Sequence, residues 1–425
     1  MATNPGVFDL AAGADQNALT AAAAQFFNAF PSLFSHNFEL PAPAAGTLTI
    51  QFKTAPTISI PLSQALAEEA LSIASTHFSD EHVETVAALL TAGTMTLACS
   101  ELGVTVQPSG GQPVTTTGTL SCLAVVEVQT NGQGQNVLVL QVTAGEFSDP
   151  SDPFTTAIVQ GAMPQLLAYL NSNVLGPIQI PNLSFANVNL VAPVVTNETA
   201  GGDEFLLAYS GMQPVNLPSE GTAWPGGAAF IGLDTAILNA VAANAIPSFN
   251  GSGGIDDPLN LSWDYSLSFS NVSFQLQPGA GNQVNGSLNM NGSAGITWHT
   301  PNGFPNISIS PGIGGSASLA VDVIAVPSGA AQQITVVIAN AGNFDLSFDG
   351  VPSWLPINAV LDAIASAVAP FLEGIRFTVY TLNPIALNFA GVSGNLTLQN
   401  LNLNQISGPN GPLLTIEAQP TFSAS

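Results

Sequence analysis

Long runs of alternating apolar and polar residues constrain the fold of this chain more than any other feature. The clearest runs lie at 135–147, 261–277, 286–300 and 332–348, and Gly, Pro and Asn residues separate them. A period of two residues is typical of antiparallel strands that bury one face and expose the other. The sequence therefore predicts a protein built mainly of antiparallel sheet, with a few apolar helices embedded in it.

Two long apolar helices are predicted at matching places in the chain. The first begins after Asp152, a good N-cap residue, with Pro153 at the first helical position. Its apolar residues recur every fourth position as far as Leu170, and a similar stripe covers 357–372. A glycine follows each helix and is expected to end it. Each unit then continues into two strands, the second marked by proline.

The order of these elements suggests a duplication. Residues 8–34 and 230–249 each combine an acidic residue near the helix start with an Ala-rich apolar helix. Between the two halves, residues 212–228 are rich in Pro and Gly and are typical of a linker. We therefore predict an α+β protein with two tandem domains, residues 1–215 and 216–425.

The charge balance excludes several classes of function. Only Lys53 and Arg376 are basic, against 27 Asp and Glu, so the formal net charge is −25. Binding of nucleic acid needs rows of Lys and Arg that neutralise phosphates. The same shortage disfavours polybasic contact with anionic membranes. Apolar burial is left as the chain's main means of holding a ligand.

Three features of the sequence bear on the compartment of the protein. The N-terminal residues lack a basic region followed by an apolar region, so no ordinary signal peptide is expected. No apolar run is long enough to span a bilayer. Trypsin-like proteases find almost no cleavage sites in the chain, which favours an extracellular or secreted protein.

Motifs that would carry catalysis are missing. A nucleophile elbow Gly-x-Ser-x-Gly is absent, and the glycines at 312–315 lack the Lys of a phosphate loop. The cluster that includes His77, Asp80, Glu81, His82 and Glu84 lacks the order of a zinc protease and is interpreted as an acidic helix start. No catalytic residue, metal or cofactor is predicted.

The two cysteines lie in strand-like runs on either side of 108–113. If Gly110 and Gly111 form a two-residue hairpin turn, Cys99 and Cys122 face each other across the hairpin. A disulfide and a pair of buried free thiols are both compatible with this arrangement.

The layout of the two halves resembles the tubular lipid-binding (TULIP) superfamily. Each half has an N-terminal amphipathic helix, antiparallel strands, and a long helix followed by a glycine and proline-marked strands. The chain is similar in layout to the bactericidal/permeability-increasing proteins. In its length and its lack of a signal peptide it is closer to the TULIP proteins encoded beside bacterial neurotoxin genes. The resemblance implies two curved antiparallel sheets, each wrapped around a long apolar helix.

The resemblance also implies a function and the residues that carry it. Each half would enclose an apolar tube that binds a lipid or another hydrophobic small molecule, without enzymatic activity. The expected lining consists of Phe26, Phe27, Phe30, Leu166, Leu167 and Leu170 in the first half, and Ile237, Leu238, Val241, Leu361, Ile364 and Val368 in the second.

Two further expectations follow from the resemblance. It implies an accessory role in a secreted toxin complex, with a protein partner. The basic tip with which the bactericidal relatives grip lipopolysaccharide has no counterpart here. The alternative is a β-rich structural or interaction module whose helices fill the cores and leave no room for a ligand.

Overall fold

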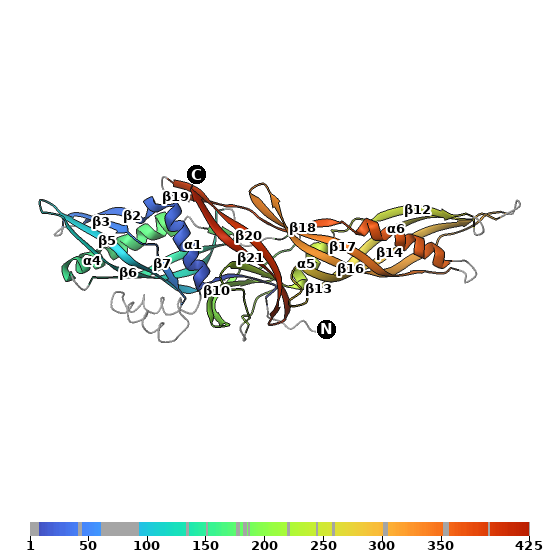
Figure 1. Cartoon of the computed structure of the whole chain (residues 1–425), viewed down its shortest axis with the longest axis horizontal. Coiled ribbons are helices and arrows are strands. Elements are labelled where there is room, and N and C mark those ends of the chain that lie inside the picture. The colour runs from blue at the N-terminus through green and yellow to red at the C-terminus, as the bar shows by residue number, and fades with distance from the viewer. Residues whose placement is uncertain are drawn as a thin grey trace.

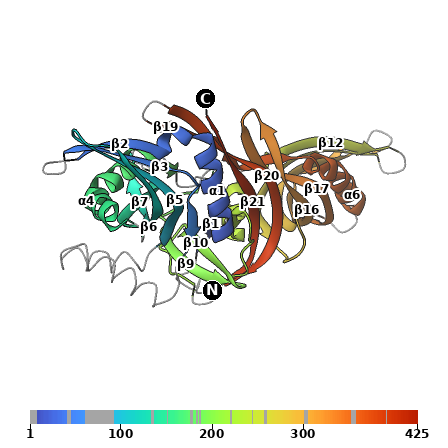
Figure 2. The ribbon, with the colours of Figure 1, turned by 60° about the vertical axis from the view of Figure 1, so that its left-hand side comes forward.

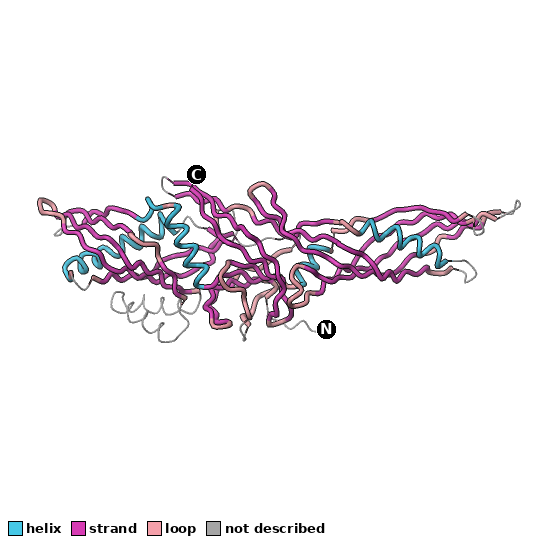
Figure 3. The backbone as a smooth tube through the Cα atoms, viewed as in Figure 1, coloured by secondary structure: helices cyan, strands magenta, loops and turns pink. Residues whose placement is uncertain are grey.

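The computed structural model shows an elongated protein built of three antiparallel sheets and a few helices (Figures 1 and 3). It describes residues 8–40, 45–60, 93–132, 136–149, 152–175, 179–181, 185, 188–218, 222–243, 245–256, 260–300, 305–351, 357–389 and 392–424. Two of the sheets curl into half-barrels at the two ends of the molecule, and the third joins them. The predicted α+β class with long antiparallel strands is confirmed.

The first sheet lies in the N-terminal half. Its strands follow the spatial order β2 (Ser35–Leu40), β3 (Gly46–Phe52), β5 (Thr94–Pro108), β6 (Val114–Thr130), β7 (Asn136–Ser148) and β8 (Gln179–Pro181), with β4 (Thr57–Ser59) beside β5. The described residues of this half include four helical segments, α1 (Gln16–Ala29), η1 (Pro31–Phe34), α4 (Pro153–Tyr169) and η2 (Leu170–Leu175). The helix α4 packs on β7, and the buried faces of sheet and helices form one hydrophobic core.

The second sheet has the same form and lies at the opposite end of the molecule (Figure 1). Its spatial order is β12 (Phe249–Ile255), β13 (Leu261–Gln275), β14 (Gln283–Trp298), β16 (Gly312–Ser328), β17 (Ala331–Phe348) and β18 (Arg376–Leu382), with β15 (Ile307–Ile309) beside β14. Among the described residues, the helices α5 (Thr235–Ala242) and α6 (Ile357–Leu372) accompany it. The helix α6 packs on β17 and β12.

The central sheet is shared by the two halves. Its spatial order is β19 (Ile385–Phe389), β20 (Val392–Gly408), β21 (Gly411–Ala424), β11 (Ala229–Leu233), β1 (Leu10–Asp15), β10 (Asp203–Ser210) and β9 (Val194–Ala200). The N-terminal strand β1 pairs with β10 on one side and with β11 on the other. The last strand, β21, also lies against α1 (Figure 2). Strands from the end of the chain therefore return to the first half.

The beginnings of the two halves repeat the same local structure. Asp15 caps α1 and accepts a hydrogen bond from the Ala18 backbone N–H at 2.7 Å. Asp234 caps α5 and accepts one from the Ala236 backbone N–H at 2.7 Å. A carboxylate at a helix N-terminus satisfies an unpaired N–H and interacts favourably with the helix dipole. The strand–aspartate–helix unit at 10–29 thus recurs at 229–242.

The two long helices also follow the sequence pattern. Asp152 accepts hydrogen bonds from the backbone N–H groups of Phe154 and Thr155, both at 3.1 Å, so the predicted N-cap is confirmed. Pro164 lies inside α4. On α6 the fully buried stripe consists of Val360, Ile364, Val368 and Leu372. Gly374 follows this helix with a positive φ of 83°, as a C-terminal glycine does.

The connecting segment 212–228 is fastened to the central sheet by carboxylates. The backbone N–H groups of Met212, Thr222 and Gly227 donate to Asp9, Glu198 and Asp15 at 2.7, 2.9 and 2.8 Å. Trp224 stacks on Phe230 of β11, with ring centroids 5.0 Å apart. In a chain with two basic residues, these carboxylates use backbone N–H groups as partners. The domain boundary at 215/216 within this segment stays a prediction.

Candidate ligand-binding cavity

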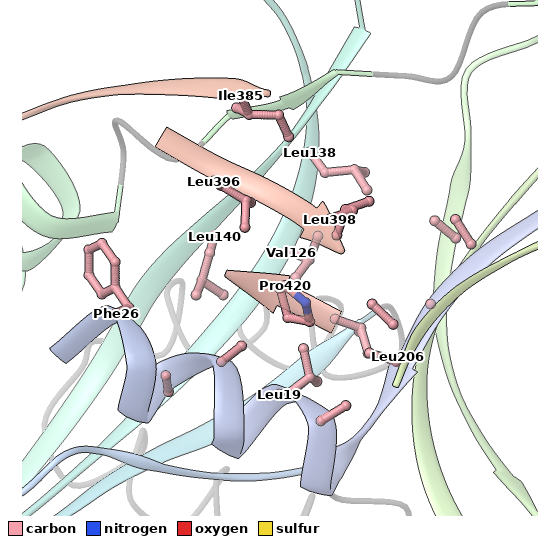
Figure 4. Close-up of a pocket in the computed structure, with 18 of the residues that line it drawn as sticks. Leu19, Phe26, Val126, Leu138, Leu140, Leu206, Ile385, Leu396, Leu398 and Pro420 are labelled. Atoms are coloured by element: carbon pink, nitrogen blue, oxygen red, sulfur yellow. The ribbon is translucent and has the colours of Figure 1, made fainter. Parts of the chain in front are cut away.

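A cavity of about 1260 Å³ lies between the first sheet and the central sheet (Figure 4). Its walls come from α1, from β5, β6 and β7, and from strands of the central sheet. The second half contributes the end of β18 together with β19, β20 and β21. Residues far apart in the sequence therefore enclose one space.

The helix α1 forms one wall. Ala18, Ala22 and Phe26 line the cavity at intervals of four residues, and Leu19 and Ala23 lie beside them. This spacing places all five on one face of the helix. Because the alanine side chains are short, the wall recedes where larger residues would fill the space. The outer stripe of the same helix, which includes Ala21, is exposed.

Apolar side chains from the sheets form the opposite walls. Figure 4 shows Val126, Leu138 and Leu140 of the first sheet facing Leu396, Leu398 and Pro420 of the central sheet across the cavity. Leu206 of β10 lies near the start of α1 in the same view. These side chains leave space in a protein that otherwise buries its apolar residues in continuous cores. The walls suit a hydrocarbon ligand.

An aromatic cluster closes the space near the C-terminal end of α1. The Phe26 ring lies 5.2 Å from Phe30, 5.7 Å from Phe34, 5.5 Å from Phe389 and 5.3 Å from Phe422, between ring centroids. Tilted and edge-on ring pairs at such distances are favourable beyond the area they bury. The cluster joins the N-terminal helix to strands of the second half.

Polar side chains are concentrated in one stretch of the wall. Most of them come from β18, from β19 and from the connection between these strands, namely Thr378, Tyr380, Thr381, Asn383 and Asn388; Asn131 and Ser210 lie elsewhere. Burial raises the pKa of Tyr380 to about 12, so its hydroxyl stays protonated in the physiological range. No charged side chain occurs among the described residues of the lining.

The structure brings some of the predicted lining residues to this cavity and places others elsewhere. Phe26 and Leu170 line it. Phe27, Phe30, Leu166 and Leu167 pack in the adjoining core of the first half. Ile237, Leu238, Val241, Ile364 and Val368 belong to the core of the second half, and Leu361 on α6 is half-buried.

Sequence reasoning missed the alanines of α1 and the whole contribution of β18 to β21. The Ala-rich composition of 18–24 was a signal for the first, since a helix that faces a core usually presents larger side chains there. No local sequence pattern indicates that β18 to β21 contribute to the cavity wall. That contribution depends on strands near the C-terminus pairing into a sheet that begins at residue 10.

The hairpin that carries the cysteines has a different register from the predicted one. Cys99 pairs with Leu120 and Cys122 pairs with Leu97, so the cysteines are diagonal neighbours and not directly opposite. The prediction was wrong because the connection spans 109–113 and a bulge lies between Cys99 and Leu102. Both residues are free thiols, buried at the cavity wall.

These thiols are expected to be unreactive in the folded protein. Burial, with a contribution from Cys99, raises the pKa of the Cys122 thiol to about 12, and the thiolate is the reactive form. With Ellman's reagent at pH 8 we expect no rapid reaction of the native protein and two equivalents released in guanidinium. Reaction of the native protein at the rate of a free thiol, or no release after unfolding, would contradict this.

The cluster His77, Asp80, Glu81, His82 and Glu84 lies outside the described residues. Within the part of the chain that the structure describes, no group of His, Cys, Asp and Glu is arranged to hold a metal ion. Among the described helices, none has the length and apolar character needed to cross a membrane.

No protein-family model and no curated protein matches the chain. Among solved structures, it is similar to P47 of Clostridium botulinum A2, with a TM-score of 0.41, 10% identity and 97% of each chain covered. It is also similar to P47 of Clostridium botulinum E1, with a TM-score of 0.45, 8% identity and coverage of 97% and 98%. For a lipopolysaccharide binding protein the TM-score is 0.34, the identity 10% and the coverage 98% and 99%.

Two curled sheets, each packed against a long apolar helix, meet at a shared central sheet. This is the arrangement that the TULIP-like layout of the sequence implies. The predicted architecture of two curved antiparallel sheets, each packed against a long apolar helix, is thereby confirmed. The described cavity lies beside the central sheet and draws on both halves.

Proposed function

We propose that this protein binds a lipid or another hydrophobic molecule in the cavity between α1, the first sheet and the central sheet. The observation that carries the proposal is an apolar space of about 1260 Å³. Pockets for small ligands usually measure about 300–1,000 Å³. The space is therefore large enough for an extended hydrocarbon chain.

The energetics of such a ligand are favourable. Each CH₂ group that leaves water for an apolar site contributes about 0.8 kcal/mol. A bound chain also supplies contacts to Leu140, Leu206 and Leu398, which line open space on one side. Binding therefore needs neither a basic residue nor a catalytic group, in keeping with the composition of the chain.

The proposal is confined to the cavity between the first sheet and the central sheet. The residues expected to line a second tube, such as Ile364 and Val368, are fully buried in a continuous core. The accessory role in a secreted toxin complex, with a protein partner, remains a prediction from the family resemblance.

Native mass spectrometry of the purified protein tests the proposal. We expect a population whose mass exceeds that of the polypeptide, and loss of the excess mass under denaturing conditions. Organic extraction should then recover a hydrophobic molecule in up to stoichiometric amount. A protein that carries no such molecule and fails to bind the neutral dye Nile red when it is added would refute the proposal.

A further inference from the structure

The polarity of the cavity wall is divided unevenly. The α1 wall presents only Ala, Leu and Phe side chains. The stretch 378–388 is more polar, because side-chain hydroxyl groups and amides belong to the lining there. Thr378, Asn383 and Asn388 are also exposed to solvent, so this stretch forms the rim by which the cavity meets water.

The groups on this rim can form hydrogen bonds but cannot balance a charge. An amide both donates and accepts hydrogen bonds, and so does a hydroxyl. Tyr380 remains neutral because burial disfavours its phenolate. Arg376 lies two residues before Thr378 on the same strand, but it is not among the lining residues.

From this division we infer that the ligand is an uncharged amphiphile, of the class of a monoacylglycerol, whose hydroxyl or ester end lies at the 378–388 rim. Its hydrocarbon chain lies against Leu19, Phe26 and Leu140. The inference rests on the proposed function and adds to it the ligand's charge and orientation. Ionised fatty acids are disfavoured because a carboxylate at this rim finds no cationic partner in the lining and is repelled by a protein whose formal net charge is −25.

We expect a change of charge at Asn383 to alter the preference for an uncharged amphiphile over an ionised fatty acid. The Asn383 side chain is exposed at the rim, so a change of charge there does not disturb the packed core. A lysine at this position would supply the cation that the natural lining lacks. Asn289, exposed on β14 in the second half, provides a matched control for the same substitution.

Displacement of bound Nile red at pH 8 tests the inference with two ligands that share one chain. We expect 1-oleoylglycerol to displace the dye at a concentration about tenfold lower than oleate. In Asn383→Lys the preference should shift towards oleate by about tenfold, whereas Asn289→Lys should behave as the natural protein. Arg376→Gln should leave the preference unchanged.

The outcomes separate the two proposals. If Nile red binds but oleate displaces it as well as 1-oleoylglycerol does, the cavity binds hydrophobic molecules and the inference of a neutral ligand is wrong. The same conclusion follows if Asn383→Lys does not alter the preference. A collapse of the preference in Arg376→Gln would assign selectivity to that residue and also overturn the inference. If Nile red does not bind at all, the proposed function itself fails.

Discussion

Replacing Ala22 by Trp should weaken the binding of Nile red strongly and reduce the amount of any co-purifying lipid, with the fold retained. Ala22 lies between Ala18 and Phe26 on the face of α1 that lines the cavity. An indole at this position extends into the space that the short side chain leaves open. We expect the dissociation constant to rise at least about tenfold, because the ligand's chain and the indole compete for one volume. Fluorescence titration measures the effect.

The neighbouring residue supplies the control. Ala21 is on the same helix but on its exposed stripe, so Ala21→Trp adds the same side chain in water. Circular dichroism should show unchanged secondary structure for both variants. Equal dye binding by Ala22→Trp and Ala21→Trp would show that the cavity beside α1 is not the binding site, while loss in both would point to a general effect of tryptophan on the helix.

The helices of this protein were predictable because their signals are local. Asp152 and Pro153 indicate the start of α4. The four-residue repeat from Ile364 to Leu372 identifies the buried face of α6. Alternation of apolar and polar residues likewise indicated the long strands. Each of these patterns lies within one element and needs no knowledge of its neighbours.

The cavity was less predictable because it depends on contacts between distant parts of the chain. A periodic stripe identifies Phe26 as inward-facing but does not say whether a side chain or a space lies opposite. The answer depends on Leu396, Pro420 and other residues that β20 and β21 bring beside α1. The predicted register of the cysteine hairpin was wrong for a related reason, since a bulge has no clear signal in the sequence.

Phe26→Ala should produce the largest loss of stability among the substitutions considered. Phe26 is buried and touches four other rings, two of which, Phe389 and Phe422, belong to the C-terminal strands. Truncating a buried Phe to Ala typically costs about 3–5 kcal/mol. Urea denaturation of the ligand-free protein measures this loss, with Phe154→Ala as the control, because Phe154 is 69% exposed.

The double variant with Phe389→Ala tests whether this cluster ties the two halves together. The rings of Phe26 and Phe389 lie 5.5 Å apart between centroids, and aromatic pairs of this kind contribute about 0.5–1.5 kcal/mol beyond their burial. We expect the two substitutions to be non-additive by that amount. Strict additivity, or a loss for Phe26→Ala no greater than for Phe154→Ala, would contradict the packing of the C-terminal strands on α1. If the coupling is present, the strands that complete the cavity also hold the first half folded, because the same Phe26 side chain serves the cavity wall and the junction.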